Sequence, residues 1–324
     1  LLLPGVLGCG RHPAYRVRVA ASRALVPLVA PEKVLSTISS IVQKLPSAQP
    51  LSNHNDAQSM LLGIHSLLEA ALWRTIGGDS KAAIARASFE ALEPAFLLLK
   101  SQKFCPPIRA QLLATLELAL RHVAQGSEVA PISERVLTEM SKVSAAALDP
   151  ITAAASELFA GDAARVLAIV ALLHCLHMHG AATEIVCLLL KAAADASYEI
   201  RLTALLHSRA LLGLAPDNAI DASIIVVPAP AKLGCPVTLE LAERASILRS
   251  IVDLVNDGQP ELALRASRTV ADAYSAFGVC CVAPGDQRAL SASAFALLSH
   301  ADPQVRASAL VLLAAGDSDR SNLC

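Results

Sequence analysis

The side chains with the clearest metal-binding chemistry in this sequence gather in residues 174–179, which read HCLHMH. On a helix His174 and His177 share one face, while Cys175 and His179 share another at a spacing of four. Imidazole and thiolate are zinc ligands, so either face could supply two of them. No acidic residue stands nearby in the sequence to orient an imidazole, and the flanking residues are apolar. We therefore predict helix-end histidines before a glycine turn, and no metal site.

A glycine-rich stretch, Gly77-Gly78-Asp79-Ser80-Lys81, has the residue types of a phosphate-binding loop. Its spacing is not that of a Walker A motif, and no G-x-G-x-x-G fingerprint occurs. We predict instead that the glycines end one helix and that Asp79 or Ser80 caps the next at Lys81. The motifs G-x-S-x-G, S-x-x-K and H-E-x-x-H are also absent. The sequence therefore predicts neither an enzyme nor a bound cofactor.

Positive charge is concentrated near the start of the chain, where the first 33 residues hold five basic side chains and one acidic one, Glu32. Arginine binds phosphate through two parallel hydrogen bonds, so Arg11, Arg16 and Arg23 are candidate contacts for a nucleic acid or a protein partner. Arg18 belongs to a phrase that recurs along the chain and is expected to be structural. A solvated helix face is the alternative for all four arginines.

The composition of the 324 residues indicates a large helical core, because 54% are hydrophobic and 17% are charged. Alanine and leucine supply much of that apolar surface and favour helices over strands. A net charge of −1 excludes a strongly basic nucleic-acid binder, and 3% aromatic residues argue against base stacking. Eight irregularly spaced cysteines without a C-x-x-C pair indicate a reducing compartment, for which we expect the cytoplasm.

The longest stretch without charged side chains, residues 166–183, contains three histidines and a glycine. It predicts a buried helix and a turn rather than a membrane span. The chain begins Leu1-Leu2-Leu3 with neither a methionine nor a preceding basic region. We interpret this start as the cut edge of a longer protein rather than as a signal peptide.

Internal repetition gives the fold prediction. An apolar residue followed by arginine opens Ala/Leu-rich segments at Val17-Arg18, Ile108-Arg109, Ile200-Arg201, Leu264-Arg265 and Val305-Arg306. The first three arginines are 91 and 92 residues apart and the last two are 41 apart, close to two units and one unit of the HEAT/armadillo period of about 40–47 residues. We predict an all-α protein, an irregular HEAT/armadillo-type α-solenoid of roughly seven helix pairs. Residues 1–214 and 237–324 are expected to form two blocks of this solenoid, joined by an irregular loop over 215–236.

Three segments carry a resemblance to a known family. Residues 12–29 (HPAYRVRVAASRALVPLV) resemble the Y-x-V-R-x-x-A-A-R-A-L-V-P segment of the THADA family of large armadillo-type proteins. Residues 55–64 are similar to that family's N-x-x-H-G-x-L-L-Q-[IV] segment, with Gln58-Ser59 in place of His-Gly and Gly63 in place of Gln. Residues 197–202 resemble its Y-E-V-R-L phrase. The family's R-R-S-A-G stretch does not occur, which implies that this chain is a C-terminal portion.

The resemblance implies a function that the residues alone do not give. Members of the family are non-catalytic partners of a methyltransferase that modifies a ribose 2′-hydroxyl in the tRNA anticodon loop, and they help to position the tRNA. For this chain the resemblance implies a scaffold subunit that binds the methyltransferase, with weak tRNA binding through this segment alone and no membrane partner. No family site residue matches well enough to be transferred. The alternative is a general protein-binding α-solenoid, such as a transport or trafficking adaptor, without an RNA role.

Overall fold

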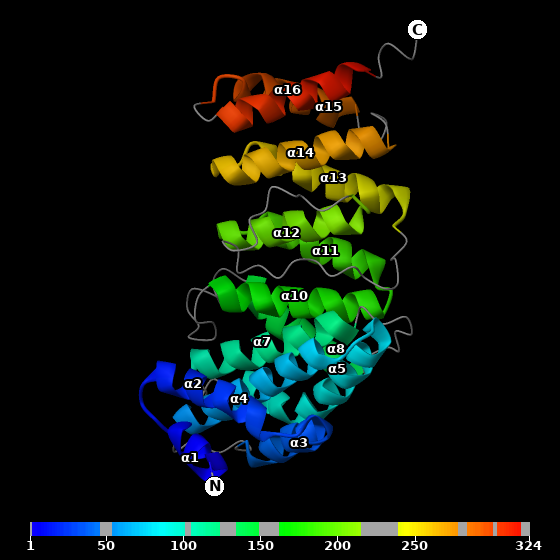
Figure 1. Ribbon diagram of the computed structural model, residues 1–324. Coiled ribbons are helices and arrows are strands. Elements are labelled where there is room, and N and C mark those ends of the chain that lie inside the picture. The colour runs from blue at the N-terminus through cyan, green and yellow to red at the C-terminus, as the bar shows by residue number, and fades with distance from the viewer. Residues whose placement is uncertain are drawn as a thin grey trace. The chain divides into compact units, whose positions relative to one another are not determined.

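The computed structural model describes residues 2–45, 54–100, 105–123, 134–148, 162–214, 239–277, 284–300 and 303–318. Within these ranges the regular secondary structure is helical, and no strand occurs. The helices belong to two compact units, α1 to α10 and α11 to α16, which are described separately. In each unit successive helices pack side by side in layers, which confirms the predicted all-α solenoid fold (Figure 1).

The first unit is built on one layer in which α2, α4, α7 and α10 pack in succession, while α3 and α5 pack against each other beside it. Its helices are α1 (Leu2–Cys9), α2 (Tyr15–Leu25), α3 (Val34–Lys44), α4 (His54–Arg74), α5 (Gly78–Leu92), α6 (Leu97–Lys100), α7 (Pro106–Val123), α8 (Glu134–Leu148) and α10 (Asp162–Met178), with 3₁₀ turns η1 (Val26–Leu28), η2 (Pro31–Lys33) and η3 (Glu93–Phe96). Buried side chains at helical spacing, such as Leu61, Ile64 and Leu68 of α4, form the core.

The second unit has two layers, one of α12, α14 and α16 and one of α11, α13 and α15. These helices are α11 (Ala182–Ala193), α12 (Tyr198–Leu211), α13 (Leu241–Val255), α14 (Pro260–Phe277), α15 (Pro284–Leu297) and α16 (Pro303–Ser318). Leu205, Ile251 and Val270 are fully buried between the layers. The phrase arginines of this unit all lie on the layer of α12, α14 and α16, so the repeat found in the sequence corresponds to one structural layer.

Prolines and glycines set the helix boundaries, as predicted. Helices α7, α14, α15 and α16 each begin with proline, whose fixed φ suits the first helical turn. Gly77, with φ +93°, separates α4 from α5, and only glycine adopts such a φ without strain. Gly77 also occupies the N-cap of α5, so the predicted cap at Asp79 or Ser80 is wrong, because the helix begins at Gly78, three residues before Lys81.

The apolar stretch 166–183 forms most of α10, a turn at Gly180 with φ +64° and the start of α11, as predicted. The two compact units meet in sequence at this turn. The loop predicted over 215–236 lies outside the described residues, so the division into blocks 1–214 and 237–324 stays a prediction. Among the residues that the structure describes, no single helix has the length and hydropathy of a membrane span. The segments Tyr15–Leu28 and Pro31–Lys44 have that length and hydropathy only when taken together, and the chain bends by 114° between them.

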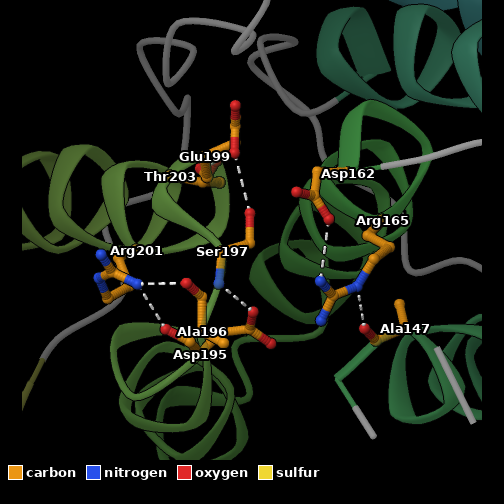
Figure 2. A network of polar contacts seen from close by, with 9 residues as sticks. All are labelled: Ala147, Asp162, Arg165, Asp195, Ala196, Ser197, Glu199, Arg201 and Thr203. Atoms are coloured by element: carbon orange, nitrogen blue, oxygen red, sulfur yellow. Dashed lines mark hydrogen bonds and ion pairs between the residues drawn. The ribbon is translucent and has the colours of Figure 1, made fainter. Parts of the chain in front are cut away.

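Three phrase arginines fold back onto the turn that precedes their own helix, and we call this arrangement the arginine clamp (Arg18, Arg201 and Arg306). Arg18 Nη1 donates to the carbonyl oxygens of residues 12 and 13, both at 2.7 Å. Arg201 Nη1 donates to the carbonyls of residues 195 and 196 at 2.8 and 2.7 Å (Figure 2). Arg306 Nη1 donates to the carbonyl of His300 at 2.7 Å. The same offset of five or six residues recurs at three of the five phrase arginines.

In two of the clamps, those of Arg18 and Arg201, further guanidinium nitrogens reach another repeat of the same unit. Arg18 Nη2 donates to Gln58 Oε1 of α4 at 2.6 Å. In the second unit, Arg201 Nε and Nη2 form a bidentate pair with Asp257, at 2.7 and 3.1 Å, in the turn after α13. Bidentate pairs of this kind are among the stronger polar contacts in proteins. The structure thus confirms the expectation that Arg18 is structural, and it shows that Arg18 and Arg201 each contact another repeat of their unit.

In the first unit an arginine outside the phrase caps a helix end. Arg165 Nε of α10 donates to the carbonyl oxygen of Ala147 in the last turn of α8, at 2.7 Å, and its Nη1 contacts Asp162 at 3.0 Å (Figure 2). The last four carbonyls of a helix lack intrahelical partners, so this contact satisfies one of them. It also joins α10 to α8, and α10 packs on α7 as well.

Candidate interaction surface

Helix α2 presents arginines of two kinds on opposite faces. Its inner face, defined by Arg18, Ala21, Ser22 and Leu25, is buried against the rest of the unit. Its outer face carries the exposed side chains of Arg16 and Arg23, seven residues apart and therefore nearly aligned along the helix. No acidic residue occurs in α2, so its outer face is purely positive.

The structure separates the three arginines predicted as contacts into two environments. Arg16 and Arg23 lie together on the outer face of α2, and neither has an ion-pair partner among the described residues. Arg11 lies in the turn before α2, where its Nε is 3.3 Å from Asp56 Oδ1 of α4. Its side chain is 74% exposed, so this ion pair is weak and leaves the guanidinium accessible. Arg11 borders a cleft to which Arg16 and Arg23 do not contribute.

A cleft of about 710 Å³ lies between α1, α2, α3 and α4, and we call it the N-terminal cleft. One wall is the inner face of α2 and the turn after it, where Leu25, Leu28 and Val29 supply an apolar surface. Leu28 is 37% exposed, unusual for a large apolar side chain beside a core. The cleft opens because the chain bends by 114° between α2 with η1 and α3 with η2, at turns that contain Pro27 and Pro31.

The opposite wall is the polar stripe of α3, in which Ser36, Thr37 and Ser40 follow one another at helical spacing. Ser36 and Thr37 donate their hydroxyl protons to the carbonyl of Lys33, at 3.0 and 2.7 Å, which leaves their oxygens available as acceptors. Lys33 and Lys44 stand at the two ends of the stripe, and both are exposed. They are eleven residues apart, about 16 Å along a helix axis.

The floor of the cleft is α4, which approaches α2 closely at Gly63. A Cβ atom at Gly63 would lie 3.4 Å from Leu25 Cδ2, an ordinary but close contact. Nearby, Gln58 accepts the hydrogen bond from Arg18, and Ser66 contacts Ser22 at 3.2 Å. Residues 12–29 and 55–64, which resemble one family in the sequence, therefore lie against each other. The sequence singled out Ser59 and Gly63 as departures from the family pattern but did not indicate that both line a cleft.

The histidine cluster of residues 174–179 lies in and just after α10. No group of three metal-binding side chains occurs among the described residues. Cys175 is fully buried, and burial raises the pKa of its thiol to about 12. His174 is only 2% exposed. It is a core residue of α10 rather than a helix-end residue.

His174 does have an acidic neighbour, which corrects the expectation from the sequence. Its Nε2 lies 3.6 Å from Glu117 Oε1 of α7, and Arg121 donates two hydrogen bonds to the same carboxylate at 2.8 and 2.6 Å. Burial raises the pKa of Glu117, but the contacts with His174 and Arg121 outweigh burial and hold that pKa below its usual value. The carboxylate is therefore charged, and the cluster is a buried structural ion pair.

His65 of α4 extends this cluster and makes the first unit sensitive to mild acid. Burial lowers the pKa of His65, and Arg121 acts in the same direction, while the carboxylates of Glu69 and Glu117 oppose the shift. The folded state then resists protonation that the unfolded chain accepts near pH 6.5, so stability falls as the pH drops below that value. We expect the thermal midpoint to fall between pH 7.5 and pH 5.5.

The measurement that checks this dependence is a melting curve at several pH values for the chain and for His65→Gln. The variant should lose less stability on acidification, because glutamine cannot take up the proton that His65 binds more readily in the unfolded chain than in the folded one. His54→Gln, at an exposed position of the same helix, is the matched control and should melt like the parent at each pH. Parallel curves for the parent and His65→Gln would contradict the assignment to His65.

Comparison with known proteins relates the first 67 residues to a characterised family. A family model described as Trm732, C-terminal TPR repeats, matches residues 1–67. The tRNA (32-2'-O)-methyltransferase regulator THADA of the dog, Canis lupus familiaris, is 38% identical to the chain over 69 residues, and that of the mouse, Mus musculus, is 36% identical over 69 residues. Each match covers 21% of this chain and only 4% of the relative.

The family match coincides with the structural features described above, since α1, α2, α3, the N-terminal cleft and the first part of α4 all fall within residues 1–67. The Arg18–Gln58 contact lies inside the same segment. The resemblance found in the sequence is thereby confirmed, because the N-terminal segment of this chain is similar to the C-terminal repeats of the THADA family.

Proposed function

We propose that this chain is part of a non-catalytic regulatory subunit of a tRNA 2′-O-ribose methyltransferase. The observation that supports the proposal most strongly is the family match over residues 1–67, because the dog and mouse relatives are named as regulators of such an enzyme. The stacked helical repeats of the solenoid fit that role, since they offer extended surfaces on which a protein and a nucleic acid can bind side by side. In this proposal the subunit holds the methyltransferase and helps to position the tRNA.

The outer face of α2 is the surface that we assign to the tRNA. Arg16 and Arg23 are exposed, lack partners among the described residues and are aligned along one helix, so both can reach successive phosphates of a nucleic-acid strand. Arg11 contributes less, because part of its charge is engaged by Asp56. Two or three phosphate contacts give weak, salt-dependent binding, in keeping with a chain whose net charge is −1.

Neutralising this face tests the tRNA role. In the full-length protein bound to its methyltransferase, Arg16→Gln with Arg23→Gln should reduce the slope of log affinity for tRNA against log salt by about 2, and adding Arg11→Gln by at most about 1 more. The measurement is tRNA binding by fluorescence anisotropy between low and moderate salt. Lys191→Gln with Arg288→Gln, which removes two exposed charges from the second unit, is the matched control. An unchanged slope would show that the outer face of α2 does not contact the tRNA.

Co-purification with the methyltransferase tests the regulatory role separately. Capture of the enzyme by this chain alone would place a binding surface in these repeats. Capture only by a longer form of the protein would make these repeats an extension that faces the tRNA. If neither form captures the enzyme, the adaptor alternative replaces the proposal, whatever the salt dependence of tRNA binding.

A further inference from the structure

We propose that the N-terminal cleft is the docking site for an acidic, amphipathic segment of a protein partner. This inference goes beyond the tRNA role, because it concerns the inner side of α2 and a protein ligand, whereas Arg16 and Arg23 lie on the outer face. The partner is defined by its chemistry and need not be the methyltransferase.

The apolar wall of the cleft favours a protein over a nucleic acid. Leu25, Leu28 and Met60 line it from α2, the turn after α2 and α4, and Leu28 remains 37% exposed. Among the described residues that line the cleft none is aromatic, so they offer no platform on which a base could stack. An amphipathic segment that inserts two or three apolar side chains would cover this wall, as in other complexes in which a helix binds a groove.

The charges around the opening determine the sign of the partner. The described residues that line the cleft include three cationic side chains (Arg11, Lys33 and Lys44) and one carboxylate, that of Asp56. Asp56 is already paired with Arg11. Lys33 and Lys44 are exposed, and neither has an acidic partner among the described residues. An incoming segment therefore meets two unneutralised ammonium groups, and carboxylates on that segment complement them.

The separation of the two lysines gives the spacing expected on the partner. Eleven residues of α3 place Lys33 and Lys44 about 16 Å apart along the wall. A helical partner would need carboxylates about eleven residues apart, and an extended one would need them about five residues apart. Between the two carboxylates the partner should carry the apolar side chains that contact Leu25, Leu28 and Met60.

Site-specific photocrosslinking in cells tests which ligand occupies the cleft. The full-length protein would carry p-benzoylphenylalanine in place of Ser40, an exposed residue of the polar wall, or in place of Ala24, exposed on α2 outside the cleft. We expect a peptide adduct at Ser40 and none at Ala24. The crosslinked peptide should carry two Asp or Glu residues about five or about eleven residues apart, with apolar residues between them. A peptide without such carboxylates, an RNA adduct or no adduct at Ser40 would overturn the proposal.

Charge reversal, first on the protein and then on the peptide, tests the electrostatic contacts between the cleft and the crosslinked segment. A synthetic, fluorescein-labelled peptide of that segment should bind Lys33→Glu with Lys44→Glu at least about tenfold more weakly than the parent, because like charges then face each other. Replacing the two acidic residues of the peptide by lysine should restore binding to this variant. Lys191→Glu in the second unit is the control and should leave the affinity unchanged. Equal affinity of the parent and the double variant, with circular dichroism showing both folded, would contradict the proposal.

Discussion

Replacing Glu117 by alanine is expected to lower the free energy of unfolding by about 3 kcal/mol, because the substitution leaves a largely buried guanidinium without its carboxylate. The Glu117 side chain is 3% exposed and that of Arg121 is 30% exposed, so little water reaches the pair. Two charge-assisted hydrogen bonds disappear together with the contact to His174. Since Arg121 retains some access to solvent, the loss should lie at the lower end of the range for broken buried pairs.

Urea unfolding followed by circular dichroism measures this loss, and hydrogen exchange localises it. Exchange should accelerate in α7 and α10, the two helices that the cluster joins. Glu117→Gln should lose less stability than Glu117→Ala, because an amide oxygen still accepts from Arg121. Glu90→Ala on the exposed surface of α5 is the matched control and should change stability by less than about 0.5 kcal/mol. A loss of under 1 kcal/mol for Glu117→Ala would show that the cluster contributes little.

In the second unit, Arg201→Ala is expected to cost about 3 kcal/mol as well, because one guanidinium makes four hydrogen bonds there. The side chains of Arg201 and Asp257 are 15% and 10% exposed, so water replaces these bonds poorly. Arg201→Lys should recover less than half of the loss, since an ammonium group cannot form the bidentate contact and reach two carbonyls at the same time. The measurement is again the change in unfolding free energy.

A double-mutant cycle isolates the Arg201–Asp257 contact from the carbonyl contacts. Asp257→Ala alone should also destabilise the chain, and the double variant should lose less than the sum of the single losses by about 1–3 kcal/mol. Arg288→Ala, at an exposed position of the same unit, controls for the loss of one positive charge. Strict additivity would mean that the two side chains act independently, despite the 2.7 Å distance between them.

The clamps illustrate what the sequence could predict, because their signal is local. An apolar residue and an arginine at a helix start recur along the chain at intervals of 41 to 92 residues, and the carbonyls that the guanidinium binds lie only five or six residues away. The repeat therefore indicated a structural role for Arg18, and the structure confirms it. Helix breaks at prolines and at Gly77 were predictable for the same reason.

The Glu117 cluster and the N-terminal cleft had no local signal. Glu117 and His174 belong to helices separated by other elements of the chain, so only the packing of α7 on α10 brings them together. The cleft depends on the angle between α2 and α3. The prolines in the connecting turns predict that the chain bends there, but they do not predict the angle of the bend. For that reason the sequence placed Arg11, Arg16 and Arg23 in one group, whereas the structure assigns Arg11 to the cleft and the other two to the outer face.

The arginine clamp has a consequence for how each unit unfolds. In repeat proteins, cooperativity depends on the coupling free energy between neighbouring repeats as well as on the stability of each repeat. Arg201 supplies such coupling, because it joins the turn before α12 to the turn after α13. Without it, α11 and α12 could unfold separately from α13 to α16, and the unfolding transition would broaden as well as shift. In the second unit, the Arg201 clamp therefore marks a point at which neighbouring repeats are expected to unfold together.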